Sequence, residues 1–211
     1  MVESGERASR SARSAIERLQ AGNARFLDAI AGTPDPSEVV ARLATADPYA
    51  IVLGCSDSRV PPEIIFGESL GQLFVVRVAG NVAGNQETGT IEYALARWGC
   101  PLVVVLGHSQ CGGIAAAMDR LPPGAEPPPD LEGASNLISL VSTIRSSLGW
   151  SDSSSADPWL DAVRINVQHT IGQLLIWSMP IRRRVEQSQL RIVGAIYHVE
   201  TGAVEFLDQM G

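Results

Sequence analysis

Four short apolar runs constrain the fold of this 211-residue chain more than any other feature. They are rich in valine and isoleucine and cover residues 49–54, 73–78, 101–107 and 190–199. An apolar run without alternation indicates a strand buried on both faces, which is typical of parallel sheets. Helical patterns lie between them, near residues 62–66, 87–98, 111–119, 135–148 and 159–188. This order predicts an α/β fold with a mainly parallel central sheet of about four strands, flanked by helices.

The two ends of the chain extend this plan. Residues 14–30 carry apolar side chains at mostly helical spacing, so we expect an N-terminal helical arm over about residues 9–31. Near the other end, "HVETGAV" predicts a turn into a short antiparallel edge strand over 204–207. Stretches rich in proline or serine predict surface loops over 121–130 and 146–158. We expect a single domain over 1–211, since a chain of this length can bury one core.

Composition excludes several classes of function. The net charge of −7 argues against nucleic acid or an anionic membrane as a partner. All 16 basic residues are arginine, which removes lysine Schiff-base chemistry and the lysine of a phosphate-binding P-loop. No apolar stretch reaches the roughly 20 residues that span a bilayer, and the N-terminus lacks a secretory apolar segment. With three cysteines, this predicts a cytoplasmic protein with free or metal-bound thiols.

Reactive side chains follow the first and third apolar runs. "CSDSR" places Cys55, Asp57 and Arg59 directly after the first run, and "GHSQCGG" places His108 and Cys111 after the third. The carboxyl ends of parallel strands share one edge of a sheet, where α/β proteins bind ligands. Two sulfurs and an imidazole nitrogen suit tetrahedral zinc, and three protein ligands leave the fourth position open. We therefore predict a catalytic Zn²⁺ site whose ligands are Cys55, His108 and Cys111.

The carboxylate and guanidinium of "CSDSR" predict a gate at this site. Asp57 is close enough in sequence to Cys55 to take the fourth metal position, and the forked donors of Arg59 could hold it away. Alternatives fit less well. A phosphatase loop needs five residues between cysteine and arginine, but three separate Cys55 from Arg59. A disulfide between Cys55 and Cys111 is geometrically possible but is not favoured in a reducing compartment.

Two further features are expected to lie outside the ligand set. Cys100 begins the third run, about 26 Å from His108 along an extended strand, so we expect a core thiol. The glycine-rich segment "RVAGNVAGNQETG", residues 77–89, lacks the glycine register of a nucleotide-binding loop. It predicts a tight turn near the site.

The two cysteine motifs together resemble those of β-class carbonic anhydrases. The resemblance runs from roughly residue 14 to 208 and includes "FVVRVAGN", "GTIEYAL" and "IVGAIYHVETGAVEFL". It implies zinc ligands at Cys55, His108 and Cys111, with Asp57 as a further ligand in a closed state. It also implies a gating dyad of Asp57 and Arg59. By the same resemblance, the substrate pocket is formed by Phe74, Ala79, Tyr93 and Gly112. The N-terminal helices would clasp a second copy in a homodimer or a tetramer of dimers.

The activity implied by the resemblance is reversible hydration of carbon dioxide to bicarbonate and a proton, by a zinc-bound hydroxide. Two positions depart from the family pattern. One subgroup, which binds a regulatory bicarbonate, has a tryptophan three residues before the first zinc cysteine, where this chain has Val52. The second departure is more serious. Many members have a glutamine nine residues before the first zinc cysteine, whose amide donates to the substrate oxygen, but this chain has Ala46. Thr45 is the nearest alternative donor in sequence. Two other functions stay open: a carbon disulfide or carbonyl sulfide hydrolase on the same scaffold, and a non-catalytic protein that binds zinc or bicarbonate.

Overall fold

The computed structural model describes residues 20–21, 23–35, 37, 45–118, 134–148 and 157–207. The chain divides into two compact units, Met1–Ala46 and Asp47–Gly211. In the first unit, residues 20–21 and 23–31 are helical, within the range expected for the N-terminal arm. The rest of that predicted arm lies outside the described residues, and the single-domain organisation stays a prediction.

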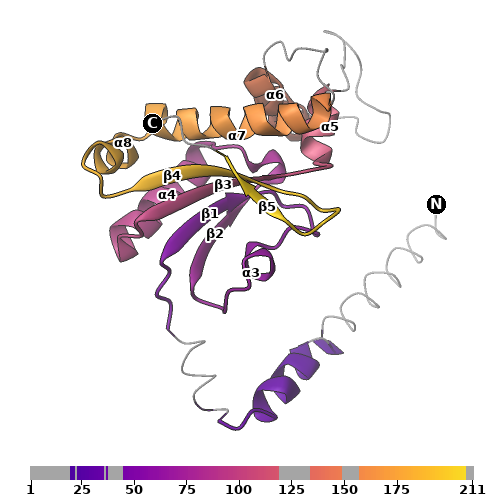
Figure 1. Cartoon of the computed structure of the whole chain (residues 1–211), viewed down its shortest axis with the longest axis vertical. Coiled ribbons are helices and arrows are strands. Elements are labelled where there is room, and N and C mark those ends of the chain that lie inside the picture. Colours follow the sequence, from indigo (N-terminus) through magenta and orange to yellow (C-terminus); the bar gives the residue numbers. More distant parts are fainter. Residues whose placement is uncertain are drawn as a thin grey trace, which may run out of the picture. The chain divides into compact units, whose positions relative to one another are not determined.

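The second unit is built on a five-stranded sheet (Figure 1). Its strands are β1 (Ala50–Gly54), β2 (Leu73–Arg77), β3 (Leu102–His108), β4 (Arg191–Tyr197) and β5 (Val204–Phe206). The order across the sheet is β2-β1-β3-β4-β5, and only the β4–β5 pair is antiparallel. This confirms the predicted α/β class with a mainly parallel sheet. Because the chain leaves β1 towards β2 on one side and β3 lies on the other, the carboxyl ends of β1 and β3 flank a topological switch point.

The helices differ from the sequence prediction in one respect. They are α3 (Pro62–Ile65), α4 (Asn85–Trp98), α5 (Gly112–Met118), α6 (Ser135–Leu148), α7 (Pro158–Trp177) and α8 (Met179–Glu186), with a 3-10 turn, η1, at Ala79–Asn81. The prediction of a single helix over 159–188 was wrong, because α7 ends before Ser178 and α8 begins after it. The Ser178 hydroxyl accepts from the Ile181 N–H at 3.1 Å and starts α8, while Pro180 has no N–H to continue α7. In the described part of the chain, no helix has the length and apolar character needed to cross a membrane.

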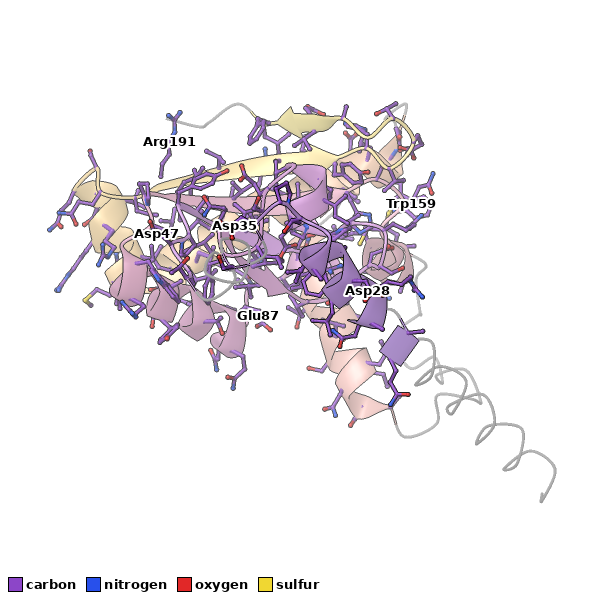
Figure 2. The ribbon with its side chains drawn as sticks, turned by 90° about the horizontal axis from the view of Figure 1, so that it is seen from below. Asp28, Asp35, Asp47, Glu87, Trp159 and Arg191 are labelled. Atoms are coloured by element: carbon purple, nitrogen blue, oxygen red, sulfur yellow. The ribbon has the colours of Figure 1, made fainter. Side chains whose placement is uncertain are left out.

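Both faces of the sheet are apolar, which explains why the strand runs do not alternate. One face carries Ile51, Leu53 and Val105, which belong to the main core with residues of α4 to α8. Figure 2 shows side chains filling the space between these ribbons. The opposite face carries a second core that includes Val52 and Val104, and residues at the end of α3 pack against it. Cys100 is buried in the main core, as expected.

The predicted loops fall largely outside the described residues. None of residues 121–130 is described, and of the range 146–158 residues 149–156 are not described. The second loop is shorter than expected at both ends, because residues 146–148 form the last turn of α6. Asp157 then caps α7 by accepting from the Leu160 N–H at 3.0 Å.

Helix α7 lies directly on the sheet because two strand residues have no side chain. A Cβ on Gly107 of β3 would lie 2.7 Å from Val167 and 2.8 Å from Val163, both on α7. A Cβ on Gly194 of β4 would lie 2.8 Å from Val167. Asn166 of α7 reaches the turn η1, which follows the carboxyl end of β2, and donates to the Gly80 carbonyl at 2.8 Å.

Candidate functional site

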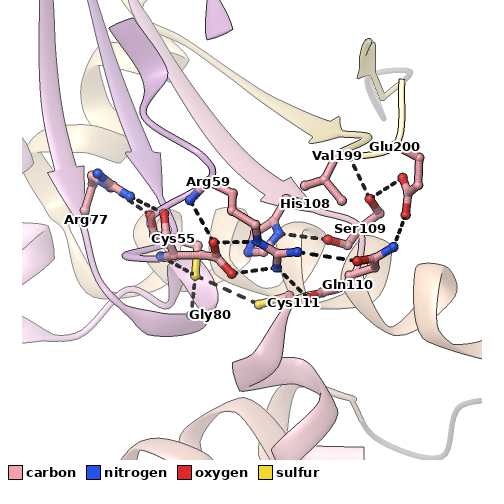
Figure 3. A network of polar contacts seen from close by, with 11 residues as sticks. Cys55, Arg59, Arg77, Gly80, His108, Ser109, Gln110, Cys111, Val199 and Glu200 are labelled. Atoms are coloured by element: carbon pink, nitrogen blue, oxygen red, sulfur yellow. Dashed lines mark hydrogen bonds and ion pairs between the residues drawn. The ribbon is translucent and has the colours of Figure 1, made fainter. Parts of the chain in front are cut away.

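Three ligand-type side chains meet at the carboxyl edge of the sheet. Cys55 follows β1, His108 is the last residue of β3, and Cys111 precedes the first residue of α5. Their ligand atoms all lie within 4.8 Å of one another, and all three residues are buried. The two sulfurs are 4.0 Å apart, and both cysteines are free of disulfides (Figure 3). The prediction that β1 and β3 bring these residues together is therefore met by the geometry.

The imidazole of His108 is oriented for a metal. Its Nδ1 lies 2.8 Å from the carbonyl oxygen of Ser109, which can only accept a hydrogen bond, so Nδ1 carries the proton. The Nε2 atom then carries no proton and presents a lone pair. It is buried and has no hydrogen-bond partner in the described part of the chain. A buried acceptor without a partner is costly, and coordination to a cation would satisfy it.

The two thiols favour a cation between them. Hydrogen bonding from Cys111, with further N–H donation by Asp57 and Gly80 at 3.4 Å each, holds the pKa of Cys55 well below its usual range. The neighbouring sulfur of Cys55, together with burial, raises the pKa of Cys111. A divalent cation would stabilise both thiolates at once, and two thiolates with imidazole are a preferred zinc set. The residues present therefore fit zinc.

Asp57 is held by Arg59 rather than joining the ligand group. Its Oδ1 accepts from the backbone N–H of Arg59 at 2.9 Å and from Nε at 3.0 Å, and Oδ2 accepts from an Arg59 terminal nitrogen at 2.8 Å. These hydrogen bonds keep the pKa of Asp57 well below its usual range. The Asp57 side chain is 20% exposed and that of Arg59 49%, so the pair reaches solvent while Cys55, His108 and Cys111 are buried. The role of the pair as a gate, and Asp57 as a ligand, stay predictions.

Two residues that hold Arg59 in place, Gln110 and Glu200, were not predicted from the sequence. We call this pair the brace. One terminal nitrogen of Arg59 donates to the side-chain oxygen of Gln110 at 3.4 Å, and the other donates to the Gln110 backbone carbonyl at 3.3 Å. The Gln110 amide in turn donates to Glu200 at 2.7 Å, and Ser109 donates to the same carboxylate at 2.8 Å (Figure 3). Glu200 lies in the turn after β4, distant in sequence from both motifs. Its position after the strand next to β3 was the only sequence signal that it could reach them.

Arg77, at the end of β2, holds the backbone of the "CSDSR" segment. Its Nε donates to the carbonyl of Cys55 at 2.8 Å, and a terminal nitrogen donates to the carbonyl of Asp57. The glycine-rich segment that follows forms η1 and contacts Cys55 through Gly80. The sequence prediction of a tight turn near the site agrees with this, although the hydrogen bond to the thiol was not foreseen.

The residues predicted to line a substrate pocket fall in two places. Ala79 begins η1, next to Gly80, and Gly112 begins α5, next to Cys111, so both lie beside the ligand group. Phe74 and Tyr93 instead belong to an aromatic cluster, with ring centroids 6.4 Å apart. Tyr93 is 58% exposed on α4. Their role as a pocket stays a prediction.

Comparison with known proteins places this geometry in a family. A family model described as carbonic anhydrase matches residues 50–204. The carbonic anhydrase of Mycolicibacterium smegmatis is 37% identical over 204 residues, covering 93% of this chain and 94% of that protein. Carbonic anhydrase 2 of Mycobacterium tuberculosis is 36% identical over 204 residues, covering 93% of each chain.

Solved structures give the same answer for the fold. One of two tetrameric β-carbonic anhydrases from Sordaria macrospora has a TM-score of 0.72 at 25% identity and covers 93% of this chain and 98% of its own. A Coccomyxa β-carbonic anhydrase in complex with acetazolamide has a TM-score of 0.72 at 26% identity, covering 91% of this chain and 86% of its own.

Proposed function

This chain belongs to the β-carbonic anhydrase family, and we propose that it catalyses the reversible hydration of carbon dioxide to bicarbonate and a proton. The observation that carries the proposal is the buried group of Cys55, His108 and Cys111, with its partnerless Nε2. In the reaction, a water oxygen forms a bond to carbon, one carbon–oxygen π bond opens, and one water proton leaves to solvent.

Zinc is the proposed cofactor, held by the Sγ atoms of Cys55 and Cys111 and by Nε2 of His108. When bound, Zn²⁺ would lower the pKa of a water to about 7 and so supply a nucleophile near neutral pH. The chain's own residues prepare the two thiolates for this task. Gly80 and Asp57 donate backbone N–H groups to Cys55, which stabilises the negative sulfur before any metal is bound.

Asp57 would orient the attacking water. Its Oδ1 already accepts two hydrogen bonds from Arg59, whereas Oδ2 accepts one, so Oδ2 has lone-pair capacity left for a water proton. Because the pKa of Asp57 is lowered by Arg59, this oxygen is an acceptor across the whole neutral range and does not donate. Arg59, itself hydrogen-bonded to Gln110, binds both carboxylate oxygens of Asp57, and this would leave a remaining coordination position of a bound zinc to water.

We propose a homodimer or a tetramer of dimers as the working unit. The tetrameric Sordaria macrospora relative supports this, as do exposed apolar side chains on α4 and α7, such as Tyr93, Ile176 and Trp177. Light scattering coupled to size exclusion would give the mass of the assembly. A monomer of 22.4 kDa at micromolar concentration would contradict this part of the proposal. The cytoplasmic location stays a prediction.

The activity itself is tested by stopped-flow hydration of carbon dioxide with zinc-loaded protein. We expect a catalysed rate that scales with zinc content. No catalysed rate at any pH up to about 9, in protein that holds one zinc per chain, would favour the non-catalytic binding role. Parallel assays with carbonyl sulfide and carbon disulfide would identify a hydrolase on the same scaffold.

A further inference from the structure

A buried chain of polar groups leads from α6 and α7 to the thiol of Cys55. Asn166 of α7 is 1% exposed, and its Nδ2 donates to the carbonyl oxygen of Gly80 at 2.8 Å. Its Oδ1 lies 2.8 Å from the hydroxyl of Ser147, on α6. On the other side of the Gly80 α-carbon, the Gly80 N–H donates to Cys55 Sγ at 3.4 Å, as Figure 3 shows. Four residues from four segments thus form one connected series.

Gly80 has a left-handed backbone conformation, which neighbouring contacts must hold in place. Its φ of 69° and ψ of 16° lie in the left-handed region, which glycine adopts more readily than other residues. A Cβ here would lie 2.6 Å from the Cδ1 of Ile144, so there is no room for a larger residue without rearrangement. A Cβ on Gly113 would lie 3.3 Å from the Gly80 nitrogen, so α5 passes close to the same peptide. Because glycine can adopt many backbone conformations, the direction of the Gly80 N–H depends on the contacts that its neighbouring peptides make.

A buried side-chain amide at position 166 is unfavourable for folding unless its polar atoms are hydrogen-bonded. Burial of a polar side chain in the core costs free energy, and α7 could pack against η1 through an apolar residue instead. The Gly80 carbonyl would then be buried without a donor. The carbonyl can only accept, so the amide nitrogen must face it. The amide oxygen then faces the Ser147 hydroxyl at 2.8 Å and shares its one proton with the Ile144 carbonyl at 2.6 Å.

We propose that Asn166 is a positioning residue for the metal site, which acts through Gly80 on the thiolate of Cys55. By fixing the Gly80 carbonyl, Asn166 keeps the adjacent N–H directed at Sγ. That hydrogen bond holds the sulfur in place and withdraws charge from it, and both effects set how tightly zinc is held. The proposal rests on the proposed function only in taking Cys55 as a zinc ligand.

The test compares zinc affinity, measured by competition with a chromophoric chelator, in the full-length parent and three variants. Asn166→Ala removes the donor, and Asn166→Leu removes it while keeping a side chain of similar size. Thr170→Ala is the matched control: Thr170 is fully buried one turn further along α7, and its hydroxyl has no partner in the described residues. We expect both Asn166 variants to bind zinc at least about tenfold more weakly, and Thr170→Ala to bind like the parent.

A second readout separates positioning from general loss of packing. With cobalt(II) in place of zinc, the thiolate-to-metal charge-transfer band reports the charge on the sulfurs. We expect this band to shift in both Asn166 variants and not in Thr170→Ala. Parent-like zinc affinity with an unshifted band in a folded Asn166 variant would overturn the inference alone. Equal weakening in Thr170→Ala would overturn it too, and a parent protein that binds no zinc would overturn the proposed function as well.

Discussion

The side-chain amide of Gln110 donates a 2.7 Å hydrogen bond to Oε1 of Glu200, and so joins two segments that are 90 residues apart in sequence. The same Gln110 accepts from Arg59, which binds both oxygens of Asp57. The turn after β4 therefore supports the Asp57 carboxylate indirectly, through Gln110 and Arg59. A flexible arginine that is half exposed gains a fixed position from this brace.

Removal of the brace should slow the reaction without loss of metal. We expect Glu200→Ala to lower the carbon dioxide hydration rate by roughly twofold to tenfold, which corresponds to one weakened hydrogen bond behind Arg59. Zinc content should stay at the parent level, because Glu200 does not contact the ligands. Glu186→Ala, an exposed glutamate on α8, serves as the control. A parent-like rate for Glu200→Ala would show that Arg59 needs no brace.

Loss of a proposed ligand should remove the metal. We expect parent protein to carry about one zinc per chain and Cys111→Ser to lose nearly all of it, because two remaining ligands cannot match three. Elemental analysis after dialysis gives the result. Cys100→Ser is the matched control, since Cys100 is also buried but donates to the carbonyl of Pro48 at 3.0 Å. Full zinc occupancy in Cys111→Ser would exclude Cys111 from the site.

Activity should rise with pH between about 7 and 8.5, the range in which a water on zinc loses its proton. Asp57 should contribute no inflection there. Its pKa is lowered by Arg59, so it ionises at a pH below its ordinary value and is already an anion throughout this range. A rate that falls as the pH rises through this range would contradict the proposed nucleophile.

The Asp57–Arg59 pair can be tested in the same range. We expect Arg59→Ala to suppress activity from about pH 7 to 8.5, because Asp57 loses the donors that hold it away from the fourth ligand position. Arg191→Ala, an exposed arginine at the start of β4, should leave the profile unchanged. If Arg59→Ala kept the parent rate, the pair would not act as a gate.

Close packing of α7 on the sheet gives a prediction for stability. Gly107→Ala would place a methyl group 2.7 Å from Val167, so we expect the free energy of unfolding to fall by about 1–3 kcal/mol in chemical denaturation. Gly172→Ala on α7 is the control. A Cβ there meets nothing within 4 Å, and alanine favours a helix by up to about 1 kcal/mol over glycine. Equal effects in the two variants would contradict the packing account.

Much of the fold and of the ligand group could be predicted from sequence because local patterns determine them. Uninterrupted apolar runs identified the parallel strands, and the rule that ligands bind at carboxyl ends brought Cys55 and His108 together. The break at Ser178 needed the hydrogen bond to Ile181, which no periodicity reveals. Asn166 and Glu200 act through contacts across the fold, and each reads in sequence as an ordinary helix or turn residue.

A substitution at Ala46 tests whether this chain lacks the hydrogen-bond donor that a glutamine supplies in many family members. A donor aimed at the substrate oxygen acts mainly in the transition state, and one such hydrogen bond is worth about tenfold to a hundredfold in rate. We expect Thr45 or another group to fill the role, so Ala46→Gln should gain little over a brisk parent enzyme at about pH 8.5. A gain of about tenfold or more would show instead that this protein lacks the donor.

The central claim is that the group of Cys55, His108 and Cys111 hydrates carbon dioxide, and stopped-flow hydration of carbon dioxide tests it most directly. Parent protein should be loaded with one zinc per chain and compared with Cys111→Ser under the same conditions. The account predicts a rapid catalysed rate at about pH 8.5 for the parent and a rate near background for the variant. A zinc-loaded parent that hydrates carbon dioxide no faster than buffer would contradict it.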